Sequence, residues 1–270
     1  MQPQFSYASA ILPILSLSLL LNAGAQTPAV PPMMVQVPYV SLAAGNTPGG
    51  VASTSKAAAC TGYADAAGNN YGDGCPANQA GVDTPWGVTV DKWGNVYFSD
   101  ETHIYVRVIY AGATTVNGVA NPATTMIPAA NASLGITTPL VAGDVYALAG
   151  GLTAGTVTTC NGGGSALSVD GSGCPATDSF LKGPYGPAVD SAGNVFIVDK
   201  SISLVYVVIA NASSKAAQLV TLENPSVTSP KVGYIYAIVN GGGGYTDGVL
   251  AFGGKVHGPF GVSVYSNDNF

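Results

Sequence analysis

The chain has 270 residues, of which 47% are hydrophobic and only 8% are charged, and its net charge is −6. So few basic residues cannot neutralise a phosphate backbone, and we expect no nucleic-acid partner. Glycine (36 residues) and proline (18 residues) are spread along the chain, which is typical of an all-β protein with short strands and many turns.

The N-terminal segment predicts export. An apolar stretch at 10–21 is followed by Ala23-Gly24-Ala25, a small-x-small pattern that signal peptidases cleave. The stretch is too short to span a bilayer, so the mature chain is expected to have no membrane span. We therefore predict a signal peptide at 1–25, a proline-containing linker at 26–37 and a folded part at 38–270, located outside the cell or in the periplasm. The alternatives are a buried N-terminal segment and a misplaced start codon.

A sequence motif repeats along the folded part. Residues 84–100 (TPWGVTVDKWGNVYFSD) and 183–199 (GPYGPAVDSAGNVFIVD) align without a gap at an offset of 99 residues. Each copy has a short alternating strand, a turn containing Asp, Gly and Asn, and a returning strand, which predicts a β-hairpin. A third copy starts at 258–264 (GPFGVSV) but has Tyr265 and Asp268 in place of the turn Asp and Gly.

Two further strands follow each hairpin. The first copy is followed by strand patterns at 104–110 and 145–151, and the second copy by matching patterns at 204–209 and 235–241. The last of these patterns also occurs before the first hairpin, at 39–45. Four short antiparallel strands per repeat make up one blade of a β-propeller. The predicted fold is an all-β propeller of four-stranded blades, incomplete at about two blades plus part of a third.

The motif of 85–100 and 184–199, Pro-x-Gly followed by Val-Asp and then Gly-Asn-Val, resembles the blade of the NHL-repeat family of β-propellers. The resemblance covers about 38–270 and is closest in character to secreted bacterial members. The loops 101–106 and 200–205 lack the arginine that this family usually carries. Propellers use roughly four to eight blades. Either the sequence is truncated, or its open sheet edges pair with other chains in a multimeric assembly.

The resemblance implies a binding or scaffold module for a protein or carbohydrate ligand. It leaves a second interpretation open, a propeller enzyme of the lyase or lactonase-like hydrolase type with a metal in the central channel. That enzyme needs several metal ligands, and the chain has only two histidines. We therefore favour binding, assign no catalytic or metal-binding residue, and predict no cofactor, with calcium as the alternative.

Four cysteines form two similarly spaced pairs. Cys60 and Cys75 precede the first hairpin, and Cys160 and Cys174 occupy the same place before the second. Four cysteines allow three pairings, and the repetition favours 60–75 and 160–174. In the chain-entropy model, each loop closure contributes roughly 3 kcal/mol. Zinc is the alternative, although zinc sites use closer cysteine spacing.

The candidate binding residues lie at or next to the repeated motif. Trp86 and Tyr185 occupy equivalent positions, and each either stacks on a sugar ring or packs between blades. His103 follows the second strand of the first hairpin. We expect a solvated loop histidine there, with a ligand-binding or basic group at the propeller mouth as the alternative.

Aspartates recur at two positions of the motif. Asp91 and Asp190 begin the hairpin turns, and Asp100 and Asp199 end the second strands. One interpretation is a ring of carboxylates that holds calcium in a central channel. The interpretation we favour is structural, because aspartate in a turn accepts hydrogen bonds from its own backbone.

Overall fold

The computed structural model describes residues 44–45, 62–64, 70–152, 172–240, 254–265 and 268, all within the compact unit Leu42–Phe270. The predicted signal peptide, the linker and most of the strand predicted at 39–45 lie outside these residues. The described part is mainly antiparallel β-sheet with two α-helices, which confirms the all-β class. In this part of the chain no helix has the length and apolar character needed to cross a membrane.

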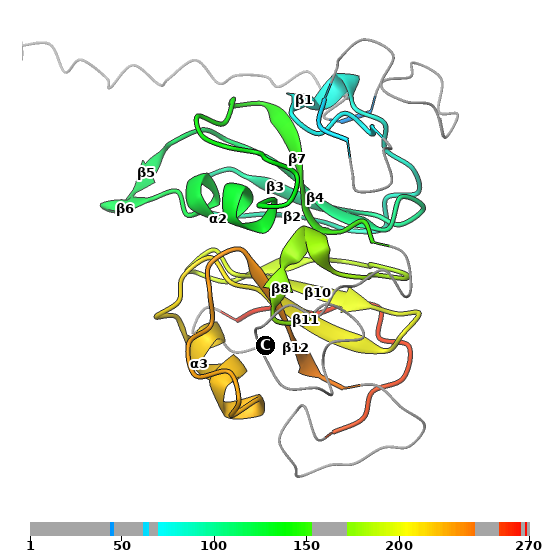
Figure 1. The fold of residues 1–270 in the computed structure, drawn as a ribbon, viewed down its shortest axis with the longest axis vertical. Helices are drawn as coiled ribbons and strands as arrows, with labels where there is room; N and C mark the ends of the chain where they lie inside the picture. Colours follow the sequence, from blue (N-terminus) through cyan, green and yellow to red (C-terminus); the bar gives the residue numbers. More distant parts are fainter. Residues whose placement is uncertain are drawn as a thin grey trace, which may run out of the picture. The chain divides into compact units, whose positions relative to one another are not determined.

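The first sheet has five antiparallel strands (Figure 1). In spatial order they are β1 (Cys75–Pro76), β7 (Asp144–Gly150), β4 (Tyr105–Ile109), β3 (Val96–Asp100) and β2 (Val88–Val90). The last four confirm the predicted hairpin and the two strands after it. The edge strand β1 was not predicted, because a Cys-Pro pair is too short to show a strand periodicity.

The second sheet repeats the same order. Its strands are β8 (Cys174–Pro175), β12 (Tyr234–Val239), β11 (Leu204–Val208), β10 (Val195–Asp199) and β9 (Ala188–Val189). Both sheets have an irregular register at equivalent places, after Val106 and after Val205. In the described part of the chain, neither five-stranded sheet closes on itself.

Each sheet carries an insertion between its third and fourth long strands. In the first sheet it contains β5 (Thr115–Val116), β6 (Val119–Ala120) and α2 (Ala123–Ala130), and in the second it contains α3 (Lys215–Glu223). Short 3₁₀ turns follow the edge strands, at η2 (Ala77–Gln79) and η3 (Ala176–Asp178). Helix α2 was not predicted, since it contains Pro128, which is unusual inside a helix. Ser214 caps the N-terminus of α3, because its hydroxyl accepts a hydrogen bond from the Ala217 backbone N–H.

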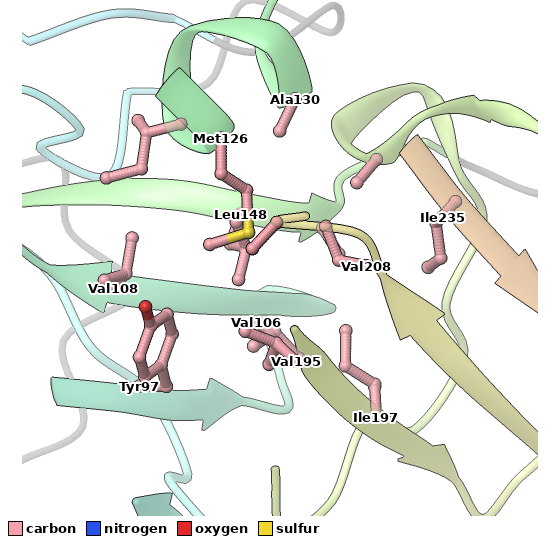
Figure 2. Close-up of a cluster of buried hydrophobic side chains, with 14 of the residues drawn as sticks. Tyr97, Val106, Val108, Met126, Ala130, Leu148, Val195, Ile197, Val208 and Ile235 are labelled. Carbon is pink, nitrogen blue, oxygen red and sulfur yellow. The ribbon is translucent and has the colours of Figure 1, made fainter. Parts of the chain in front are cut away.

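The largest hydrophobic cluster lies between the two sheets. It is made of alternate residues from facing strands, together with residues of α2 (Figure 2), and includes Tyr97, Val106, Val108, Leu148, Met126, Ala130, Val195, Ile197, Val208 and Ile235. The opposite face of the second sheet packs against α3, Val262 and Val264. The second sheet is therefore buried on both faces, by the first sheet on one side and by the third repeat copy on the other.

The three repeats also meet along their leading strands, which are β2, β9 and residues 261–264. A Cβ added to Gly87 would lie 2.3 Å from the Cα of Gly186, so only glycine permits this approach. Gly186 in turn forms a parallel bridge with Gly261. The leading strands of successive copies thus lie side by side at their N-terminal ends.

Helix α2 connects the two sheets. Its residues Met126 and Ala130 belong to the cluster between the sheets. The hydroxyl of Thr177, in η3 of the second sheet, donates a 2.6 Å hydrogen bond to the carbonyl oxygen of Ala130. Just beyond the helix, the Ser133 hydroxyl donates to the Asp178 carboxylate at 2.5 Å. The insertion of the first sheet is therefore part of the contact with the second.

Candidate functional site

Three aromatic residues at equivalent repeat positions gather where the leading strands begin. We call Trp86, Tyr185 and Phe260 the aromatic file. The Trp86 ring stacks on Tyr185 with centroids 5.2 Å apart, and Phe260 meets Tyr185 edge-on at 5.5 Å. Trp86 is 56% exposed and Phe260 64%, whereas Tyr185 is half-buried. The predicted residues Trp86 and Tyr185 therefore contact each other across the repeats and also present a surface to solvent.

Two charged side chains of opposite sign flank the aromatic file. The Trp86 indole N–H donates to the Glu101 carboxylate at 3.4 Å. The Lys200 ammonium lies 4.2 Å from the centroid of the Phe260 ring and 5.2 Å from that of Tyr185, a cation–π arrangement. Glu101 and Lys200 occupy equivalent repeat positions. The aromatic residues thus follow the repeat, while the charges beside them do not.

Sequence reasoning did not select Phe260, Glu101 or Lys200. The alignment of the third copy contained the signal for Phe260, because it stands where the first two copies have Trp86 and Tyr185. The sequence contained no such signal for Glu101 and Lys200. They are equivalent loop residues of opposite charge, and only the structure shows that they contact the aromatic rings.

Asp100 lies at the centre of a buried polar group in the first sheet. One carboxylate oxygen accepts the backbone N–H of Asp83 at 3.0 Å, and the other accepts from Arg107 Nη1 at 3.3 Å. The Nδ1 atom of His103 lies 2.9 Å from the Asp100 carboxylate. We call Asp73, Asp100, His103 and Arg107 the buried charge cluster.

Arg107 links this cluster to the segment that covers the first sheet, which contains Tyr71, Asp73 and Gly81. Its guanidinium donates to the Asp73 carboxylate from Nε (3.2 Å) and Nη2 (2.9 Å), and to the carbonyls of Gly81 (2.6 Å) and Tyr71 (3.2 Å). Burial raises the pKa of Asp73, and the positive charge of Arg107 opposes that rise. Arg107 is fully buried with these acceptors, so its removal would leave buried carboxylates without their cation.

The expectation of a solvated His103 is wrong. The side chain is only 6% exposed, and its ring stacks on Tyr71 with centroids 3.9 Å apart. Its Nε2 is buried and has no hydrogen-bond partner among the described residues. The loop turns inward because Asp100 binds Nδ1 and Tyr71 covers the ring. His103 is therefore not part of the solvent-facing surface that carries the aromatic file.

Asp199 has a simpler environment than its equivalent Asp100. Its carboxylate accepts the backbone N–H groups of Lys182 (2.6 Å), Gly183 (3.1 Å) and Ser201 (3.1 Å). Burial raises the pKa of Asp199, and these backbone hydrogen bonds act in the opposite direction. The shared role of the two aspartates is to hold the loop in front of the leading strand.

The turn aspartates have the structural role that we favoured. The Asp91 carboxylate accepts the backbone N–H groups of Trp93 and Asn95, both at 2.9 Å, and the Asn95 side-chain amide at 2.7 Å. Asp190 makes the equivalent contacts with Ala192 and Asn194. Among the residues that the structure describes, no group of three or more His, Cys, Asp or Glu side chains is placed to hold a metal. The prediction of no cofactor, and calcium as its alternative, both stay untested.

At the opposite end of the leading strands lies a hollow of about 300 Å³. Equivalent residues of the three copies line it, including Val90, Val189 and Val264. On its rim, Asp268 accepts hydrogen bonds from the Ser191 hydroxyl (2.7 Å) and backbone N–H (2.9 Å). Partial burial acts to raise the pKa of Asp268, but these hydrogen bonds and nearby lysine charges lower it overall.

The described cysteines lie in the edge strands β1 and β8. Neither Cys75 nor Cys174 is a free thiol. Cys60 and Cys160 lie outside the described residues, so the pairing 60–75 and 160–174 stays a prediction.

The chain matches no family model, and no curated protein matches it. Its likeness to NHL repeats therefore depends on the motif at 84–100 and 183–199 alone. The structure shows that the equivalent aromatic residues of this motif contact one another at one surface.

Proposed function

We propose that the two sheets and the third-copy segment are successive blades of an NHL-like β-propeller. Three observations support this proposal: the strand order is the same in both sheets, the register shifts fall at equivalent places, and the leading strands lie side by side. A propeller needs this arrangement, because each blade packs face to face on its neighbours around one axis.

We propose further that the chain is an exported binding module whose aromatic file contacts a protein ligand. The observation that carries this proposal is the gathering of Trp86, Tyr185 and Phe260 at one end of the leading strands, with opposite charges beside them. Exposed aromatic residues dominate the energetics of protein interfaces, and flanking charges add specificity.

A site-directed crosslink tests the protein ligand. Phe260 is replaced by photoreactive benzoylphenylalanine, and the protein is irradiated in the extracellular fraction of its producing cells. We expect one main adduct by mass spectrometry, and Trp86→Ala should reduce its yield about tenfold, which corresponds to about 1.4 kcal/mol. The control probe replaces Leu222, an exposed residue on α3. Equal adducts at both positions, or no effect of Trp86→Ala, would contradict the proposal.

A carbohydrate is the second candidate ligand, favoured by the polar groups beside Trp86. Glu101 binds the indole N–H, and the hydroxyls of Thr84 and Thr102 lie 2.8 Å apart at the exposed end of the same loops. An exposed ring next to a carboxylate and hydroxyls can stack on a sugar and bind its hydroxyl groups. Titration calorimetry with neutral oligosaccharides tests this. Binding that is lost in Trp86→Ala and kept in Leu222→Ala would identify a sugar, not a protein, as the ligand.

A further inference from the structure

Two neighbouring segments of the first sheet carry Trp86 and Glu101. Trp86 lies in the loop 83–87, before β2, and Glu101 lies in the turn 101–104, after β3. Two contacts join loop and turn: the Trp86 indole N–H donates to the Glu101 carboxylate, and the Glu101 backbone N–H donates to the Thr84 carbonyl oxygen, both at 3.4 Å. The position of Trp86 therefore depends on how the loop and the turn are held together.

Each of these segments contains a β-branched residue with left-handed backbone geometry. Thr84 has a φ of 52° and Ile104 a φ of 60°. A β-branched side chain rarely adopts this region, and it stays there only where the surrounding contacts enforce it. The equivalent residues of the second sheet, Gly183 and Ser203, are not β-branched. The loop and turn beside Trp86 are therefore strained in a way that their counterparts are not.

The Asp100 carboxylate contacts both segments. At the start of the loop it accepts the Asp83 backbone N–H at 3.0 Å, and in the turn it lies 2.9 Å from His103 Nδ1. The Asp83 carboxylate in turn accepts the Thr84 hydroxyl at 2.9 Å. Among the described residues, Asp100 meets the turn 101–104 only through the His103 side chain.

The second sheet holds its equivalent segments through backbone groups. The Asp199 carboxylate accepts the backbone N–H groups of Lys182, Gly183, Ser201 and Ile202. Ile202 stands where the first sheet has His103, so its side chain contributes no hydrogen bond to the turn. The first sheet thus uses one side chain where the second uses two backbone N–H groups.

Histidine at this position carries a cost. Because a carboxylate only accepts hydrogen bonds, Nδ1 of His103 carries the proton and donates it to Asp100. The other ring nitrogen, Nε2, is then a buried acceptor without a partner among the described residues, which destabilises the folded state. Isoleucine would bury no such atom. The contact with Asp100 is therefore what distinguishes histidine from an apolar residue here.

We propose that His103 is a positioning residue for the aromatic file: by binding Asp100 it fixes the turn 101–104, and through that turn it places Glu101 against the Trp86 indole. The inference rests on the binding function proposed above, and His103 acts on that surface without touching the ligand. Arg107 holds the Asp100 carboxylate at 3.3 Å, so the acceptor itself is fixed. Without the His103 contact, Ile104 leaves its strained conformation and Glu101 moves away from the indole.

The two tryptophans of the chain provide the test, since each indole N–H has its own acceptor. Trp86 donates to Glu101, and Trp93 donates to the Val119 carbonyl oxygen at 2.9 Å. Heteronuclear NMR of isotopically labelled protein resolves both groups. We expect His103→Leu to shift the Trp86 indole resonance toward its position in Glu101→Ala, and to leave the Trp93 resonance unchanged. His103→Asn should restore the wild-type position, because its side-chain amide N–H replaces that of Nδ1.

Three results would overturn the inference: an unmoved Trp86 resonance in His103→Leu, equal movement of both indole resonances, or no restoration by His103→Asn. If circular dichroism shows that His103→Leu is unfolded, His103→Ile, which copies the second sheet, is measured with the same criteria. Unfolding of both variants would also overturn it, because His103 would then serve the fold as a whole.

The crosslink from position 260 separates this role from the binding function. His103→Leu should lower the adduct yield by about threefold, less than the loss expected for Trp86→Ala. A shifted Trp86 resonance with an unchanged adduct yield would overturn the inference and leave the binding function intact. A shifted resonance in a protein whose wild type gives no adduct would remove the binding function and keep the role of His103 in placing Trp86.

Discussion

The two sheets share strand order and turn residues, but they have different side chains at three equivalent positions. Where the first sheet has Asp73, His103 and Arg107, the second has Ser172, Ile202 and Tyr206. The equivalent aspartates, Asp100 and Asp199, are present in both, and both hold a preceding backbone N–H group. The aspartate thus belongs to the repeat, whereas the other three ionisable groups belong to the first sheet alone.

The covering of each sheet explains this difference. The relevant face of the second sheet packs on the first sheet, whose side chains there are apolar. The same face of the first sheet is covered by a loop, in which the Gly81 carbonyl needs a donor and the Tyr71 carbonyl accepts a second one besides the Gly81 backbone N–H. Arg107 supplies those donors, and Asp73 and Asp100 balance its charge. The face covered by the loop therefore includes charged side chains beside its apolar cluster, whereas the equivalent face covered by a sheet is apolar at these positions.

The largest predicted effect comes from Arg107→Tyr, which introduces the residue of the second sheet. The change leaves two buried carboxylates without their cation, so we expect a loss of about 3–5 kcal/mol in the free energy of unfolding. Urea denaturation followed by circular dichroism measures it. Tyr206→Phe in the second sheet should lose no more than about 1 kcal/mol. Similar losses in both sheets would show that the cluster has no special structural role.

The triple variant Arg107→Tyr, Asp73→Ser and His103→Ile sharpens that result. It copies the second sheet's composition and removes the uncompensated charge of Asp73, so part of the stability should return, about 1–3 kcal/mol relative to Arg107→Tyr. Recovery stays partial because the Gly81 carbonyl still lacks the Arg107 donor, whereas the Tyr71 carbonyl keeps the backbone N–H of Gly81. A triple variant less stable than Arg107→Tyr would contradict the account.

Equivalent glycines should respond unequally to alanine. A Cβ at Gly87 would lie 2.3 Å from the Gly186 Cα, which is backbone and cannot rotate away. Among the described residues, a Cβ at Gly186 meets only the Phe260 carbonyl oxygen, at 3.9 Å. We expect Gly87→Ala to lose about 2–3 kcal/mol of unfolding free energy and Gly186→Ala less than about 1 kcal/mol. Thermal and urea denaturation of both variants measure the difference, and equal losses would disprove the close approach of the leading strands.

A smaller effect is expected for Tyr97→Phe. The buried Tyr97 hydroxyl donates to the Asp91 carboxylate at 2.9 Å, and burial together with the charge of Asp91 raises the tyrosine pKa well above its usual value. The second sheet has Phe196 at this position. Because Asp91 keeps its other donors, the variant should lose about 1 kcal/mol in urea denaturation. A loss above about 3 kcal/mol would mean that the two turns are not equivalent.

The smallest effect concerns pH. Because burial raises the pKa of Asp199 in the folded state, the folded protein binds more protons than the unfolded chain between the two pKa values. The contribution of Asp199 to stability is therefore full below the ordinary aspartate pKa and is lost as pH rises through the folded value. Asp199→Asn should flatten this decline by less than about 1.4 kcal/mol per pH unit. Urea denaturation from about pH 4 upward tests it, and an unchanged slope would refute the prediction.

The hairpins and the strands after them were predictable because 84–100 and 183–199 carry local turn and alternation signals. The edge strand Cys75–Pro76 and helix α2 were not, since one is too short for a period and the other contains a proline. In the candidate site, Trp86 and Tyr185 followed from the repeat.

The buried charge cluster could not be predicted in the same way. Arg107 meets Asp73 and Tyr71 across 34 and 36 residues of sequence, and no local pattern encodes such contacts. The burial of His103 has the same cause, because the ring that covers it belongs to Tyr71.

The insertion that contains helix α2 couples the two sheets through hydrogen bonds to η3. Because Ala130 and Ser133 bind η3 of the neighbouring sheet, neither half can melt without breaking contacts of the other. Nearest-neighbour coupling of this kind makes a repeat array behave as one cooperative unit. A fragment ending before 172 would expose the apolar face that now packs on the second sheet, and it would be expected to aggregate instead of folding autonomously.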